Sequence, residues 1–141
     1  MDLDEVIAAA LGARGRAYAP YSGFHMGAAV LTVGGAIITG ALVENVSLGL
    51  AMCAERVALF AAVASGERPA TLVVASPRTS GALTFPCGAC LQVGLELGGR
   101  ELVVVAVDPD GTNERAVLGD LLPRGPHKGD RRSADGASDN P

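Results

Sequence analysis

The chain lacks tryptophan, has only 4% aromatic residues, and carries three cysteines and two histidines among its 141 residues. A small, odd number of cysteines does not fit a disulfide-stapled secreted domain, and no signal-peptide pattern is present. We therefore expect a cytoplasmic protein. A chain of this length buries roughly 68% of its unfolded surface, which is enough for one core without disulfides. The cysteines are therefore free for chemistry.

Basic charge is also scarce. Eleven Lys and Arg residues stand against fifteen Asp and Glu residues, giving a net charge of −4. The basic residues are scattered, so no basic surface for a nucleic-acid partner is expected. Glycines and the pair Glu55-Arg56 interrupt the apolar stretches well before the roughly 20 residues that span a bilayer, so no membrane partner is expected either.

Apolar periodicity predicts an alternation of helices and strands. We expect a first helix at about 3–18, a second over 53–64 that starts near Met52, and a short third over 91–97. Extended apolar segments predict strands at 26–33, 36–41, 72–75 and 102–107, the first two joined by a two-residue turn at Gly34-Gly35. A hairpin followed by two strand-helix-strand crossovers predicts an α/β fold with three α/β/α layers around a mixed sheet.

The predicted domain covers residues 1–123. From Arg124 onward the chain has no apolar residue larger than alanine. Such a segment buries too little apolar surface to offset its ordering entropy. We expect 124–141 to be a flexible polar tail.

All three cysteines lie where predicted helices begin. Cys53 opens one helix, and Cys87 and Cys90 lie three residues apart at the start of another. Helix starts offer free N–H groups and a positive dipole end, which favour thiolates. Three thiolates can hold one Zn²⁺ and leave a fourth position open, as catalytic zinc sites do. A closed structural zinc would need a fourth ligand such as His25 or His127, and neither histidine lies in a cysteine motif.

Two charged residues follow the first cysteine. Glu55 is two residues beyond Cys53, where it could accept a proton from water and return it to a leaving amine. Arg56, three residues beyond Cys53, is placed to offset the excess negative charge of three thiolates. Taken alone, both would be read as solvated helix residues.

Several segments resemble the small homotetrameric cytidine deaminases in order and spacing. They are YAPYSGF at 18–24, GALVENVSLG at 40–49, CAERVALF at 53–60, PCGACLQ at 86–92 and GDLLP at 119–123. Cys-x-Glu followed by Pro-Cys-x-x-Cys is the signature of zinc deaminases. The resemblance implies a cytidine-deaminase-like fold, a homotetramer with active sites completed across subunits, and a role in pyrimidine salvage.

The resemblance also implies roles for single residues. It assigns the zinc ligands to Cys53, Cys87 and Cys90 and the proton shuttle to Glu55, and it makes Arg56 the charge-balancing arginine. It further implies that Phe24 packs on the pyrimidine, that Ala54 lies by the base, and that Glu44 binds a ribose hydroxyl. The implied substrate is a small pyrimidine nucleoside, deaminated at C4.

The sugar-binding segment departs from the family pattern. Leu42 stands where an asparagine is usual, Leu48 where a tyrosine is usual, and Leu91 where an arginine is usual; after Pro123 the usual aromatic is missing. Leu42 and Leu48 are either drift or part of an apolar pocket. We hypothesise a deaminase with a non-standard sugar preference. The alternatives are a deaminase of blasticidin-type aminoacyl-nucleoside antibiotics and a non-catalytic zinc-binding subunit.

Overall fold

The computed structural model describes residues 2–129. Its elements follow in chain order: α1 (Leu3–Arg14), β1 (Gly27–Thr32), β2 (Ile37–Ala41), a 3₁₀ helix η1 (Leu48–Leu50), α2 (Ala54–Ala64), β3 (Pro69–Ala75), α3 (Gly88–Gly98), β4 (Val103–Val107), β5 (Asn113–Val117) and α4 (Leu118–Leu121).

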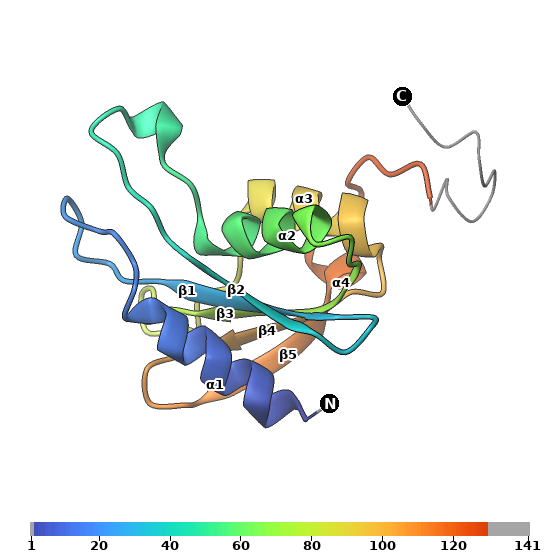
Figure 1. Cartoon of the computed structure of the whole chain (residues 1–141), viewed down its shortest axis with the longest axis horizontal. Helices are drawn as coiled ribbons and strands as arrows, with labels where there is room; N and C mark the ends of the chain where they lie inside the picture. The colour runs from blue at the N-terminus through green and yellow to red at the C-terminus, as the bar shows by residue number, and fades with distance from the viewer. Residues whose placement is uncertain (1, 130–141) are drawn as a thin grey trace.

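The five strands form one mixed sheet in the order β2-β1-β3-β4-β5. β3 and β4 run parallel, and the other neighbouring pairs are antiparallel. Helix α1 covers one face, and α2, α3 and α4 lie on the other (Figure 1). The predicted three-layer α/β/α fold with a mixed sheet is confirmed.

Strand alternation divides the buried side chains into two cores. On β1, Ala28 and Val30 face the cluster under α2 and α3, whereas Ala29 faces the cluster under α1. β4 follows the same rule, because Val104 joins the first cluster and Val105 the second. Both central strands are thus apolar on both faces, as expected for strands sandwiched between helical layers.

Both early helices differ from their predicted bounds. α1 ends at Arg14 rather than near residue 18, because Gly15 is a poor helix former and Tyr18 instead donates its N–H to the carbonyl of Leu42 at 2.8 Å. α2 begins at Ala54 rather than near Met52, because Cys53 has extended backbone angles and is the N-cap.

The hairpin turn is longer than the predicted glycine pair. Thr32 donates its N–H to the carbonyl of Ala36, so residues 33–35 form the loop, and Gly35 holds the left-handed φ of +94° that the turn needs.

Two C-terminal elements, β5 and α4, were not predicted from the sequence. β5 is an edge strand of largely exposed, partly charged residues and lacks the apolar pattern that marked the other strands. The short α4 follows it directly. The central strands were predicted correctly, although β3 starts earlier, at Pro69, where its pairing with β1 begins.

The predicted tail falls only partly within the described residues. In its first residues, the Pro126 carbonyl accepts a 2.8 Å hydrogen bond from Gln92 Nε2 on α3. Residues 130–141 lie outside the described part of the chain, so the flexible tail remains a prediction. Among the described residues, no helix is both long and apolar enough to cross a membrane.

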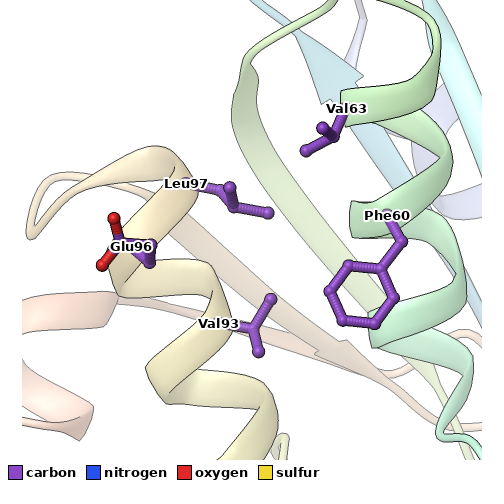
Figure 2. Close-up of a pocket in the computed structure, with 5 residues that line it drawn as sticks. All are labelled: Phe60, Val63, Val93, Glu96 and Leu97. Atoms are coloured by element: carbon purple, nitrogen blue, oxygen red, sulfur yellow. The ribbon is translucent and has the colours of Figure 1, made fainter. Parts of the chain in front are cut away.

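Helices α2 and α3 leave an apolar groove between them. Phe60 and Val63 of α2 face Val93 and Leu97 of α3, and Glu96 also lines the groove (Figure 2). Phe60 and Val63 are 46% and 52% exposed, which is high for large apolar side chains. None of the three cysteines lines this α2–α3 groove.

Candidate functional site

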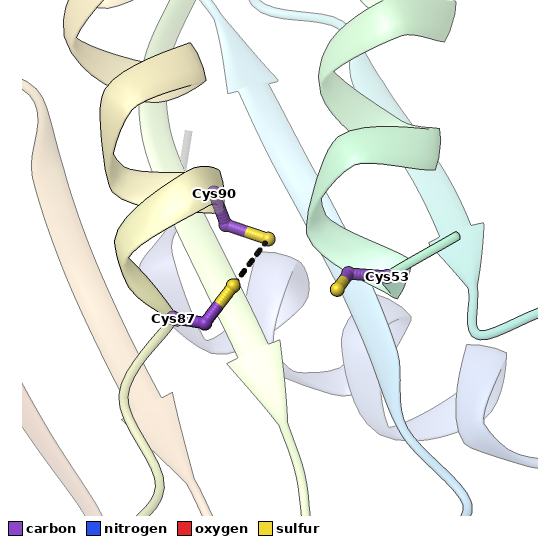
Figure 3. A group of neighbouring side chains, drawn as sticks. All are labelled: Cys53, Cys87 and Cys90. Carbon is purple, nitrogen blue, oxygen red and sulfur yellow. Dashed lines mark hydrogen bonds between the residues drawn. The ribbon is translucent and has the colours of Figure 1, made fainter. Parts of the chain in front are cut away.

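The fold brings the three cysteines together at the starts of two adjacent helices. Cys53 is the N-cap of α2, Cys87 is the N-cap of α3, and Cys90 lies in the first turn of α3. Their sulfur atoms all lie within 4.8 Å of one another, and the Cys87 and Cys90 sulfurs are 3.6 Å apart. Figure 3 shows the three side chains converging on one point.

This arrangement fits a tetrahedral zinc ion. Zinc binds sulfur at about 2.3 Å, so two tetrahedral sulfur ligands lie about 3.8 Å apart. Neither N-cap cysteine uses its sulfur to cap its own helix, which leaves both free to bind metal. His25 and His127 are not members of this group, and His25 Nδ1 instead contacts the carbonyl of Gly23 at 2.9 Å. Three protein ligands leave one coordination position open.

The surroundings of Cys53 favour its thiolate even without metal. A hydrogen bond from Cys90 and the Arg56 guanidinium, whose Nη2 lies 3.3 Å from the Cys53 sulfur, lower the pKa of Cys53 to about 5 against the opposing effect of burial. The same hydrogen bond and burial raise the pKa of Cys90, so the metal-free pair keeps one proton. Zinc would displace that proton on binding.

Glu55 is not a solvated helix residue. Its side chain is buried, at 2% exposure, and Oε1 has no hydrogen-bond partner among the described residues. Burial, reinforced by the charge of Cys53, raises the pKa of Glu55 to about 7. A carboxyl group that titrates near neutrality can both take up and release a proton at working pH. The unpartnered oxygen close to Cys53 leaves a hydrogen-bonding position free for a small molecule.

Glu44 is bonded to the loop that carries Phe24. Its Oε1 accepts the N–H groups of Tyr21 and Ser22 at 3.0 and 3.2 Å, and Oε2 accepts the Ser22 hydroxyl. The Ser22 hydrogen bond is the main cause of a lowered pKa for Glu44. Ser22 Oγ also accepts the N–H of Phe24 at 3.0 Å. Phe24 is half-buried.

The remaining predicted residues lie in different surroundings. Ala54 is fully buried at the start of α2. Leu42 is partly buried against the cluster under α2 and α3. Leu48, in η1, is 85% exposed. The two leucines therefore sit in different environments, one against the core and one in solvent. Leu91, the third departure, is buried in that same cluster.

Sequence reasoning missed three side chains that organise the loops around the site. Ser22 links Glu44 to Phe24, and Arg78 and Asp108 form a partly buried contact between two loops. The Asp108 signal was present, since an acidic residue that directly follows a fully apolar strand at a turn is commonly bonded to backbone N–H groups. Its partner Arg78 lies 30 residues away, and no local pattern connects the two.

Comparison with known proteins identifies the sequence family of this site. The cytidine and deoxycytidylate deaminase zinc-binding region matches residues 1–106. A cytidine deaminase of Halalkalibacterium halodurans is 41% identical over 123 residues, which is 87% of this chain and 92% of that protein. A cytidine deaminase of Mycobacterium tuberculosis is 45% identical over 107 residues, 76% of each chain. The crystal structure of a Burkholderia pseudomallei cytidine deaminase superposes with a TM-score of 0.82 at 46% identity, covering 89% of this chain and 99% of that one.

Proposed function

Because the chain belongs to the cytidine and deoxycytidylate deaminase family, we propose that it is a zinc-dependent hydrolase that converts a cytosine nucleoside to the uracil nucleoside and ammonia. The observation that carries this function is the buried, unpartnered Glu55 oxygen beside the cysteine cluster. A zinc site that served only folding would have no use for a buried carboxyl group there.

The reaction exchanges the amino group on C4 of the cytosine for an oxygen from water. When bound by Cys53, Cys87 and Cys90, zinc supplies the Lewis acidity that makes a water molecule nucleophilic near neutral pH. Glu55 accepts the proton that the water loses and donates a proton to the departing amino group, which leaves as ammonia. Arg56 offsets the excess negative charge at Cys53.

The proposed substrate is a free nucleoside. The net charge of −4 does not favour a polynucleotide. In this proposal, Phe24 and Ala54 contact the base and Glu44 contacts the sugar. Leu42 and Leu48 are the two positions that differ from the family in the sugar-binding segment. Leu42 offers no hydrogen bond where the family has an asparagine, so we infer a preference for a nucleoside other than plain cytidine or deoxycytidine. A lost hydrogen bond of this kind costs about 0.5–1.5 kcal/mol.

The decisive experiment measures ammonia release by the zinc-loaded protein. Cytidine, deoxycytidine, free cytosine and a blasticidin-type nucleoside are compared, with Glu55→Gln as the control variant. We expect release from at least one cytosine nucleoside and a loss of about 10²–10⁴-fold in Glu55→Gln, because one positioned acid/base group supplies that much. Zinc content, measured on both proteins, should be equal, since Glu55 is not a ligand.

Each outcome distinguishes the candidates. Efficient turnover of cytidine would show that leucine at position 42 is a tolerated substitution, and it would overturn the proposed change in sugar preference. Turnover confined to the blasticidin-type compound would favour the antibiotic deaminase. A protein that holds zinc but releases no ammonia from any of the four would be the non-catalytic subunit, and the proposed activity would be wrong.

We further propose that the protein works in the cytoplasm as a homo-oligomer, a homotetramer by family resemblance. Zinc-binding thiolates need a reducing compartment, and all three cysteines are free thiols. The exposed apolar side chains of the α2–α3 groove, Phe60 and Val63, are the contacts we propose for self-association.

A further inference from the structure

An ion pair between an exposed arginine and a buried aspartate joins the segments that follow the parallel strands β3 and β4. Arg78 lies just beyond β3 and Asp108 just beyond β4. Arg78 Nε lies 2.9 Å from Asp108 Oδ2, and the Asp108 side chain is only 4% exposed. Neither residue takes part in the deamination described above.

Asp108 is a fixed anchor on the β4 side. Its Oδ1 accepts the N–H groups of Asp110 and Thr112, both at 3.0 Å, so the carboxylate also organises its own turn. Burial acts to raise the pKa of Asp108, but the Arg78 hydrogen bond and these two N–H groups outweigh it and lower the pKa. The group is therefore a charged, fully bonded carboxylate at neutral pH.

On the β3 side, Arg78 holds a closed loop. Its Nη1 donates to the carbonyl of Gly81 at 3.1 Å while Nε holds Asp108. Thr84 Oγ1 closes the base of the loop by donating to the carbonyl of Pro77 at 2.8 Å. Ser80 has a left-handed φ of 52°, an unfavourable conformation for serine that the surrounding bonds must maintain.

This loop leads directly into a zinc ligand. Only Phe85 and Pro86 separate Thr84 from Cys87. Phe85 packs against the core under α2 and α3, and Pro86 is buried with its φ fixed by its ring. Cys87 itself is the most exposed of the three cysteines; α3 holds it on one side, where its carbonyl accepts the N–H of Leu91 at 2.9 Å, and this approach holds it on the other.

We propose that the Arg78–Asp108 pair is a positioning device that holds Cys87 in place for the metal. The proposal rests on the cysteine cluster as the zinc site, but not on which nucleoside is deaminated. Groups that orient a metal ligand without touching the metal typically change metal affinity 10–100-fold when removed. The pair acts through the 77–84 loop, so we place the effect at the lower end of that range.

The test measures how fast the full-length zinc protein loses zinc to an excess of a coloured chelator, with no substrate present. Arg78→Leu removes both contacts of the guanidinium. Asp108→Asn keeps an oxygen for the N–H groups of Asp110 and Thr112 but presents an amide to Arg78, so it breaks the pair and spares the turn. Arg78→Lys keeps the charge but cannot make both directed contacts.

We expect zinc loss to be about 10-fold faster in Arg78→Leu and Asp108→Asn, with Arg78→Lys in between. The double variant should be no worse than either single variant, because the two residues act as one unit. Cobalt-loaded variants should also show a changed thiolate-to-metal absorption, which reports ligand geometry directly.

Val6→Ala is the matched control, since Val6 is fully buried in α1 on the opposite face of the sheet. Its melting temperature falls through lost packing far from Cys87. Equal acceleration of zinc loss in Val6→Ala at a matched melting temperature would overturn the proposal, because the pair would then matter only for stability. Unchanged zinc loss in both Arg78→Leu and Asp108→Asn would overturn it as well. Zinc loss and cobalt absorption are both measured without turnover. A failure of the proposed deamination would therefore show only in the ammonia-release experiment.

Discussion

Arg56 reaches back from the first turn of α2 to the sulfur of Cys53, at 3.3 Å. Three thiolates carry one more negative charge than zinc carries positive charge, and that excess weakens the metal as a Lewis acid. In the proposed mechanism, the Arg56 guanidinium next to the Cys53 sulfur offsets part of this charge. The contact is local, because the two residues lie three positions apart at the start of one helix.

Replacing Arg56 with glutamine should lower the turnover number about 10-fold while zinc remains bound, because the ligand set is unchanged but its charge is no longer offset. Arg56→Lys should recover part of the activity. Arg16→Gln serves as the control, since Arg16 makes only a 3.5 Å contact with Thr39 Oγ1. Steady-state kinetics gives the turnover number, and metal analysis shows whether zinc is still bound. Equal activity in Arg56→Gln and the parent protein would show that Arg56 has no role in the reaction.

The spacing of the residues at the start of α2 was enough to predict that they lie close together. Cys53, Glu55 and Arg56 share one helical turn, so their proximity is a local property of the chain. The burial of Glu55 was not predictable, because it depends on the strands and helix packed around α2. The Ser22 contact with Glu44 spans 22 residues and was likewise beyond local reasoning.

At the scale of elements, the start of α2 lies directly on strand β2. A Cβ atom at Gly40 would come within 2.5 Å of the Ala58 backbone nitrogen and 2.6 Å of the Ala54 carbonyl oxygen. Both neighbours are backbone, so the helix itself would have to move. The helix carries Cys53 at its N-cap, and this contact therefore sets where one zinc ligand lies.

Gly40→Ala should cost about 1–3 kcal/mol of unfolding free energy, as overpacking does, and should weaken zinc binding by displacing Cys53. Gly12→Ala provides the opposite case, because Gly12 lies in α1 with nothing within 4 Å of the added methyl group. That control should stabilise the protein by about 0.5–1 kcal/mol through helix propensity. Denaturant unfolding measures both, and a neutral Gly40→Ala would show that α2 has room to shift.

Elements were predictable where burial leaves a simple pattern. β4 is a run of valines and alanine buried on both faces, and such runs are recognisable without a structure. β5 is a polar edge strand whose position depends on pairing with β4, so its own residues do not reveal it. The end of α1 was placed too late because the helix stops at Gly15 and the chain then turns to pair Tyr18 with Val43, a contact distant in sequence.

For the whole molecule, the α2–α3 groove is the surface on which a second copy of this chain is expected to dock. Phe60→Glu should shift the molar mass measured by light scattering toward the monomer, because a buried, unpaired charge at an interface is costly. Val33→Glu is the control, since Val33 is 69% exposed in the hairpin loop and does not line the groove. A parent protein that is already monomeric would contradict the proposed oligomer.

The order of elements along the chain also bears on when the site is complete during synthesis. Cys53 precedes β3, whereas Cys87 and Cys90 follow it, and β4 is made later still. Asp108, which anchors the loop leading to Cys87, emerges from the ribosome after all three ligands. A nascent chain therefore carries three cysteines before it can hold them in register. If the Arg78–Asp108 pair positions Cys87 as proposed, stable zinc loading is expected to be completed only when β4 and the turn that follows it have folded.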